Sequence, residues 1–165
     1  WLGYQCRGLG KYILRKNASA IKDFNMALEL MPKYYLTMAA EAMNYMALAK
    51  YELKEYKDAT ADINGAIVLA SFIKQPKGRY FHNRGLILYM FSDEMPKNKI
   101  SMLEQAKRDL TKAIELKSVA LPNSYYLRAN TNYELDKKNK ESICEDLSKS
   151  KNLGLKSNYL DSFCE

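Results

Sequence analysis

Four aspartates recur along the chain, and carboxylates are among the side chains most often used for acid–base catalysis. They are Asp23, Asp62, Asp109 and Asp146, which are 39, 47 and 37 residues apart. Catalytic carboxylates must converge within hydrogen-bonding reach of one substrate, whereas side chains that occur once per repeat are spread along the fold. The regular spacing therefore predicts a structural role for these aspartates.

Three arginines recur with the aspartates and offer them partners of opposite charge. They are Arg7, Arg84 and Arg128, each upstream of one aspartate. We expect Arg–Asp pairs that tie neighbouring helices together.

The other reactive side chains form no recognisable catalytic or metal site. His82 is the only histidine, which excludes a histidine-based metal cluster and a relay that needs two histidines. The sequence contains no Gly-rich phosphate loop and no clear combination of nucleophile and base. We therefore expect a protein that is not an enzyme and that holds no metal and no cofactor.

Small and large apolar residues recur around each aspartate at helical spacing. The first unit has Ala20, Phe24, Ala27 and Pro32, and the later units repeat this order with Ala59, Ile63 and Ala66, with Ala106, Leu110 and Ala113, and with Ser142, Leu147 and Ser150. Upstream, a small residue is followed four positions later by a tyrosine: Gly8 and Tyr12, Ala47 and Tyr51, Gly85 and Tyr89, Ala129 and Tyr133. Residues three or four apart share one helix face, so each unit is expected to contain two helices.

This pattern resembles the tetratricopeptide repeat (TPR), a helix–turn–helix unit of 34 residues. In the first unit, Gly8, Ala20, Phe24, Ala27 and Pro32 sit at the signature spacing of the family. The resemblance implies an all-α fold, a right-handed α-solenoid of about four repeats with a C-terminal capping helix. We expect a single domain over residues 1–165, with repeats at 1–32, 33–72, 77–118 and 122–154 and the cap at 155–165.

The composition also favours helices. Val68 and Val119 are the only valines, whereas Ala, Leu, Met, Lys and Glu are abundant. We expect the first helices of the units near 2–14, 34–53, 78–91 and 123–135, the second helices near 17–30, 56–71, 100–117 and 140–152, and a terminal helix near 156–163. The longest apolar stretch, Gly85 to Phe91, is too short to span a bilayer, which takes about 20 residues.

The resemblance further implies where a partner binds. In TPR proteins the first helices line a concave surface, where positions 5, 9 and 12 of each unit face the bound segment. In this sequence those positions hold Gln5, Leu9, Tyr12, Asn44, Leu48, Tyr51, His82, Leu86, Tyr89, Tyr126, Asn130 and Tyr133. The tyrosines offer a large amphipathic contact area to a peptide or helix, and the alternative is that each packs against the next repeat. Gln5 and Leu9 are not the lysine and asparagine with which some TPR domains clamp a carboxyl terminus.

The resemblance therefore implies a non-catalytic scaffold that holds a segment of another protein. The alternative is a basic helical repeat that binds nucleic acid or another polyanion, because the chain carries a net charge of +7. Its basic runs, such as Lys137, Lys138 and Lys140, fall mostly on loops and second helices. This placement on the outer face favours an ordinary solvated surface.

The three cysteines predict one disulfide. If the last helix of the fourth unit ends near Gly154 and the terminal segment folds back, Cys144 and Cys164 lie level, whereas Cys6 lies in the first helix. We expect a Cys144–Cys164 disulfide, and the alternative is three reduced cysteines, which is usual in the cytosol. The C-terminal segment resembles the ending of bacterial TPR proteins of the cell envelope. That resemblance implies a periplasmic or envelope-associated location, and a cytoplasmic one stays open.

Overall fold

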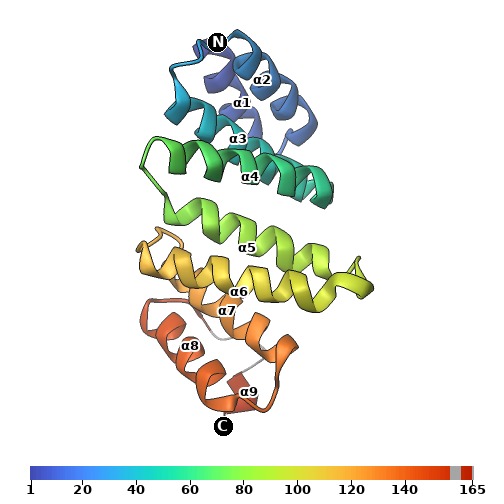
Figure 1. Ribbon diagram of the computed structural model, residues 1–165, viewed down its shortest axis with the longest axis vertical. Helices are drawn as coiled ribbons and strands as arrows, with labels where there is room; N and C mark the ends of the chain where they lie inside the picture. The colour runs from blue at the N-terminus through green and yellow to red at the C-terminus, as the bar shows by residue number, and fades with distance from the viewer. Residues whose placement is uncertain (157–160, 165) are drawn as a thin grey trace. The chain divides into compact units, whose positions relative to one another are not determined.

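The computed structural model describes residues 1–156 and 161–164 of the chain, and helices are the only extended regular structure in those residues (Figure 1). In chain order they are α1 (Leu2–Ile13), α2 (Asn17–Leu30), α3 (Leu36–Glu52), α4 (Tyr56–Phe72), α5 (Gly78–Ser92), the 3-10 helix η1 (Pro96–Asn98), α6 (Lys99–Glu115), α7 (Leu121–Leu135), α8 (Lys140–Asn152) and α9 (Asp161–Cys164). The expected all-α fold is confirmed. Of the expected terminal helix, positions 157–160 lie outside the described residues.

The contacts divide the chain into two compact units, Trp1–Pro76 and Lys77–Glu165. The division falls between α4 and α5, where Pro76 lacks the backbone N–H that a continuing helix needs. Unit 1 contains α1 to α4 and unit 2 contains α5 to α9. Within each unit every helix from the second to the fourth packs against the one before it. The first and third helices also touch, α1 with α3 in unit 1 and α5 with α7 in unit 2.

The recurrent small residues mark the places where paired helices approach most closely. A Cβ atom on Gly8 would meet the ring of Phe24 at 3.0 Å, and one on Gly85 would meet Cγ of Leu110 at 2.9 Å. Both distances are shorter than an ordinary carbon contact, so a side chain at either position of α1 or α5 would force its neighbour on the paired helix to move. The alanines of the same pattern, including Ala20, Ala66 and Ala113, have no exposed surface. Close packing therefore explains the pattern of small residues.

The expected Arg–Asp pairs are present on three helix pairs. Nε and Nη2 of Arg7, Arg84 and Arg128 donate to the two carboxylate oxygens of Asp23, Asp109 and Asp146 at 2.7–2.8 Å. This two-point geometry is the strong form of the Arg–carboxylate interaction. Nη1 of Arg128 also donates to Oγ1 of Thr111 at 3.1 Å, so this side chain joins three successive helices.

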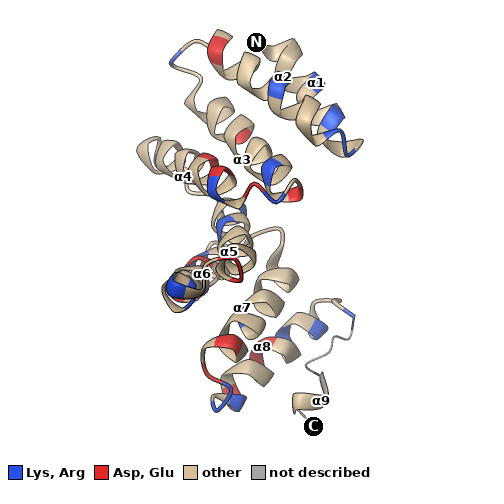
Figure 2. Ribbon diagram, turned by 90° about the vertical axis from the view of Figure 1, so that its right-hand side faces the viewer, with Lys and Arg blue, Asp and Glu red and all other residues tan. Residues whose placement is uncertain are grey.

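The second helix pair uses a different cation. Met46 occupies the position of the arginine and is buried against α2, so Nζ of Lys50 contacts Asp62 instead, at 2.7 Å. Burial outweighs this contact and raises the pKa of Asp62. The pKa of Asp23 is lowered to about 2, chiefly by its hydrogen bonds from Arg7. Charged residues of both signs occur in both units (Figure 2).

Five helices end in the same turn, and four of these turns place a basic residue where glycine is usual. A positive φ occurs two residues after the last residue of each helix, at Arg15, Lys54, Lys74, Lys117 and Gly154. In every case its N–H donates to the carbonyl three residues earlier, and the next N–H donates to the carbonyl five residues earlier, at 2.8–3.2 Å. This is the Schellman motif, in which the left-handed residue lies beside the negative end of the helix dipole. The negative end of the helix dipole therefore stabilises the positive charge of the basic side chains at these turns.

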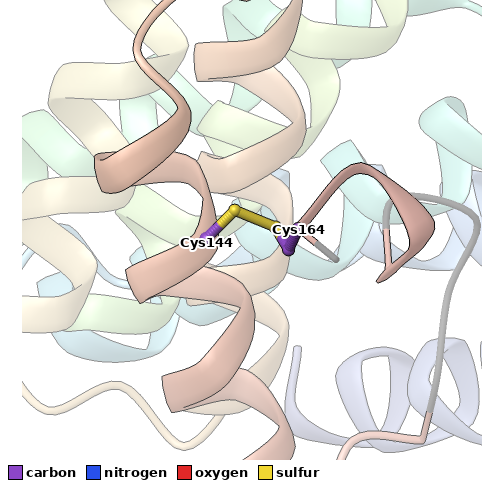
Figure 3. The surroundings of a disulfide bond; sticks show 2 residues. All are labelled: Cys144 and Cys164. Carbon is purple, nitrogen blue, oxygen red and sulfur yellow. A yellow bond between two sulfur atoms is a disulfide. The ribbon is translucent and has the colours of Figure 1, made fainter.

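A disulfide fastens α9 to α8 (Figure 3). It joins Cys144 and Cys164, the pair expected from the sequence, with their Cα atoms 5.6 Å apart. Cys6 is a free, exposed thiol. The bridge brings the ring of Phe163 edge-on to that of Tyr133 on α7, with centroids 5.1 Å apart.

Removing an arginine from a buried pair should cost far more than removing one from an exposed pair. Arg128→Met leaves the carboxylate of Asp146, only 2% exposed, without its cation, and we expect it to lower the free energy of unfolding by about 3 kcal/mol. Arg7→Met is the matched control: Arg7 is 58% exposed and Asp23 keeps Lys11 at 2.7 Å, so the loss should be much smaller than that of Arg128→Met. Urea unfolding measures both values. Equal losses would contradict this account.

Replacing Cys144 and Cys164 together by serine should lower the stability of unit 2 by about 2–4 kcal/mol, because the bridge closes a loop between positions 20 apart in the sequence. Thermal unfolding measures the change. Cys6→Ser is the control and should leave the melting temperature unchanged, since Cys6 is exposed and unbridged. Thiol counting on the denatured, unreduced wild type should find one reactive thiol, and three would show that the bridge is absent.

Candidate functional site

The expected groove residues lie on the first and third helices of each unit. In unit 1 these are Gln5, Leu9 and Tyr12 on α1 and Asn44, Leu48 and Tyr51 on α3. In unit 2 they are His82, Leu86 and Tyr89 on α5 and Tyr126, Asn130 and Tyr133 on α7. Because α1 touches α3 and α5 touches α7, each unit brings its six residues onto neighbouring helices. Asn44, His82 and Asn130 are buried and the other nine are half-buried.

Tyr12, Tyr51 and Tyr133 use part of their rings for internal packing. The ring centroids lie 5.8 Å from Tyr45 for Tyr12, 5.9 Å from Tyr56 for Tyr51 and 5.1 Å from Phe163 for Tyr133. Burial raises the pKa of the Tyr12 and Tyr51 hydroxyl groups. Each ring nevertheless keeps some exposed surface. The tyrosines therefore pack against neighbouring elements and retain an edge that a partner can reach.

In unit 2 the structure contains a surface hollow between α5 and α7, which we call the α5–α7 hollow. It has a volume of about 260 Å³ and is lined by His82, Leu86, Asn123, Tyr126 and Leu127. Three of these residues belong to the expected groove. Asn123 and Leu127 were missed, although Asn123 lies three residues before Tyr126, a spacing that puts both on one helix face.

The polar end of the hollow is fixed by a contact between its two helices. Nδ1 of His82 lies 2.9 Å from Oγ of Ser124, whose hydroxyl also lies 3.0 Å from the carbonyl of Ala120. Burial lowers the pKa of His82 to about 4, so the imidazole is neutral at pH 7. Ser124 has no exposed surface, so its oxygen cannot reach a substrate. The pair therefore positions α7 on α5 and is no nucleophile–base combination.

The charged side chains are distributed over several helices. Within residues 1–156 and 161–164, no three His, Cys, Asp or Glu side chains come close enough to hold a metal ion. Arg108 and Lys112 are exposed on α6, and Nζ of Lys112 pairs with Glu115 at 3.0 Å. Nζ of Lys137 lies 4.6 Å from the ring centroid of Tyr133. The helices in the described part of the chain all lack the length or the apolar character that crossing a bilayer requires.

No protein-family model matches the chain, and no curated protein sequence matches it either.

The buried His82 should make stability depend on pH between about 4 and 6.5. Below pH 6.5 the unfolded chain binds a proton at His82, whereas the folded protein does so only near pH 4. Above pH 6.5 the titration of His82 therefore leaves the free energy of unfolding unchanged. Below that pH the free energy of unfolding falls, by up to about 1.4 kcal/mol per pH unit.

His82→Gln tests this pH dependence directly, because the chain has no other histidine. Urea unfolding of both proteins from pH 7 to pH 5 should show a decline in the wild type that the variant lacks. The difference between the two proteins cancels the titration of the carboxylates. Parallel curves would mean that His82 titrates normally and is not buried.

Proposed function

We propose that the chain is a non-catalytic interaction module of the TPR type, which binds a peptide or helical segment of another protein. The proposed architecture is a right-handed solenoid of about four repeats with a short C-terminal cap. Support comes from helices that pack in adjacent pairs, from contacts between the first helices of successive pairs, and from small residues at the close contacts within pairs.

The observation that carries the proposal is the α5–α7 hollow, since it gathers His82, Leu86 and Tyr126 of the expected binding surface. Its volume of about 260 Å³ lies below the ~300–1,000 Å³ typical of small-molecule sites. Leu86, Tyr126 and Leu127 supply apolar walls, and His82 and Asn123 supply polar atoms. A hollow of this size and chemistry suits one apolar side chain of a partner segment, with hydrogen bonds to its backbone.

Unit 1 repeats the same residue types on α1 and α3. Leu9 and Leu48 correspond to Leu86, and Tyr12 and Tyr51 correspond to Tyr89. All four are half-buried, so each leaves an apolar edge on the surface. We infer that unit 1 also offers leucine and tyrosine edges to a partner segment, and that this surface recognises shape more than charge.

We place the protein in an oxidising compartment such as a bacterial periplasm. The Cys144–Cys164 disulfide supports this, because such bridges persist in oxidising compartments and are rare in the cytosol.

Binding should be abolished by changes inside the hollow and spared by neighbouring changes outside it. Peptides selected by the wild-type protein from a displayed random-peptide library provide the probe. We expect Leu86→Ala and Tyr126→Ala each to weaken binding at least tenfold, since buried aromatic and aliphatic anchors dominate such interfaces. The controls are Ile100→Ala, an exposed aliphatic on α6, and Tyr125→Ala, the neighbouring tyrosine that lies outside the hollow.

The same assay separates this function from polyanion binding. Binding to an apolar groove should change little between 50 and 200 mM salt, whereas phosphate contacts of a polyanion weaken steeply over that range. Equal binding by the hollow variants and the wild type would contradict the proposal. A preference for acidic peptides or nucleic acid, lost at the higher salt concentration, would instead support the polyanion alternative.

A further inference from the structure

Unit 1 contains a hollow that is lined almost entirely by apolar side chains, which we call the α2–α4 hollow. It has a volume of about 420 Å³ and lies where the end of α2 and the turn after it meet α3 and α4. Leu28 lines it from α2, Leu36 and Met43 line it from α3, and Leu69 lines it from α4. None of the expected groove residues is part of its lining, so it is a different site from the proposed partner-binding surface.

Close packing of α3 on α4 shapes one wall of the hollow. A Cβ atom on Gly65 of α4 would meet Sδ of Met43 at 2.9 Å, so this glycine lets the methionine lie directly on α4. Met31, which is buried, supplies a second thioether to the lining. Methionine side chains are unbranched and fit irregular shapes. The hollow can therefore adjust to a flexible apolar ligand.

The side chains around the hollow offer few hydrogen bonds. Nine residues line it, and the ammonium group of Lys33 and the hydroxyl group of Tyr35 are the only strongly polar groups on their side chains. A peptide segment needs partners for its backbone N–H and C=O groups. An alkyl chain needs none, and it gains free energy with each methylene group that it buries. The chemistry of the lining therefore favours an aliphatic chain over a peptide.

Lys33 supplies the one charge among the lining residues, and it is exposed. It lies in the turn between α2 and α3, which is closed by a hydrogen bond of 3.0 Å from the N–H of Tyr35 to the carbonyl of Pro32. No hydrogen bond or ion pair to another described residue occupies its ammonium group. No Asp or Glu lines the hollow. An anionic head group on an aliphatic chain would complement this arrangement.

An aromatic cluster borders the hollow beside Lys33. The ring centroid of Tyr35 lies 4.9 Å from that of Trp1 and 4.6 Å from that of Tyr34. Tyr34 is 77% exposed and Tyr35 is 40% exposed, so both rings reach the solvent. Tyrosine and tryptophan suit a boundary between an apolar and an aqueous region. The hollow thus has an apolar interior and a rim that carries aromatic rings and one cation.

We propose that the α2–α4 hollow binds a fatty acid, with the aliphatic chain against Leu28, Met43 and Leu69 and the carboxylate at Lys33. Its volume of about 420 Å³ lies within the ~300–1,000 Å³ typical of small-molecule sites. One cation at the rim neutralises the single negative charge of a carboxylate. The inference concerns unit 1 alone and is independent of the proposed partner-binding function.

Filling the hollow should block the aliphatic chain. Ala39 is half-buried in the lining, so Ala39→Leu places a larger side chain there. Ala61→Leu makes the same change at an exposed position of α4 outside the hollow and is the control. By calorimetry we expect saturable binding of decanoate to the wild type, at least tenfold weaker in Ala39→Leu and unchanged in Ala61→Leu. Octanoate should bind the wild type about tenfold more weakly than decanoate, because it lacks two methylene groups.

A second pair of variants tests the head group. Lys33→Gln should weaken octanoate binding about threefold, as expected for an exposed ion pair, and should leave the binding of octan-1-ol unchanged. Lys22→Gln neutralises an exposed lysine of α2 outside the hollow and should alter neither. Because an exposed lysine contributes little to folding, this pair decides the proposal even if Ala39→Leu lowers the stability of the protein.

Three results would overturn the proposal: absence of saturable decanoate binding to the wild type, equal weakening by Ala39→Leu and Ala61→Leu, or octanoate binding that Lys33→Gln leaves unchanged. Sedimentation and the peptide assay identify other occupants. Dimerisation or peptide binding that Ala39→Leu abolishes, in a protein that binds no decanoate, would assign the hollow to a second copy or to a protein partner and would equally overturn it.

Discussion

The close approach of paired helices is the constraint on which each unit depends. Gly8 and Gly85 lie so close to Phe24 and Leu110 that even a methyl group at either position would displace the neighbouring side chain. Helices held this close have no room for water between them, so the polar groups near the contact must satisfy one another. Arg–Asp pairs meet this requirement on three of the helix pairs, and Lys50 pairs with Asp62 on the remaining one, α3 and α4.

The helices and the Arg–Asp pairs between them could be predicted from the sequence, because both follow from local spacing. The period of Ala20, Phe24 and Ala27 defines a helix face, and an arginine upstream of each of three aspartates defines the pairs. The cysteine pair followed from the expected turn near Gly154. The division after Pro76 did not follow, because a proline between repeats occurs equally within a continuous array.

The candidate site was harder to predict because position on a helix does not determine exposure. His82 and Asn130 share the spacing of Leu86 and Tyr126 but are buried. The start of α5 also lies against the turn after α6, and no local pattern in the sequence relates Arg79 to Lys117. The positive φ of Lys117 could not be predicted either, because glycine is the residue that usually occupies this position of such a turn.

The basic residues at the helix ends have a consequence for proteolysis. Arg15, Lys54, Lys74 and Lys117 are exposed in turns, where a protease can engage the backbone more readily than within a helix. A protease that cleaves after lysine and arginine would thus meet its preferred side chain at the end of α1, α3, α4 and α6. Limited digestion would release fragments whose ends coincide with helix boundaries, and cleavage after Lys74 would separate the two units.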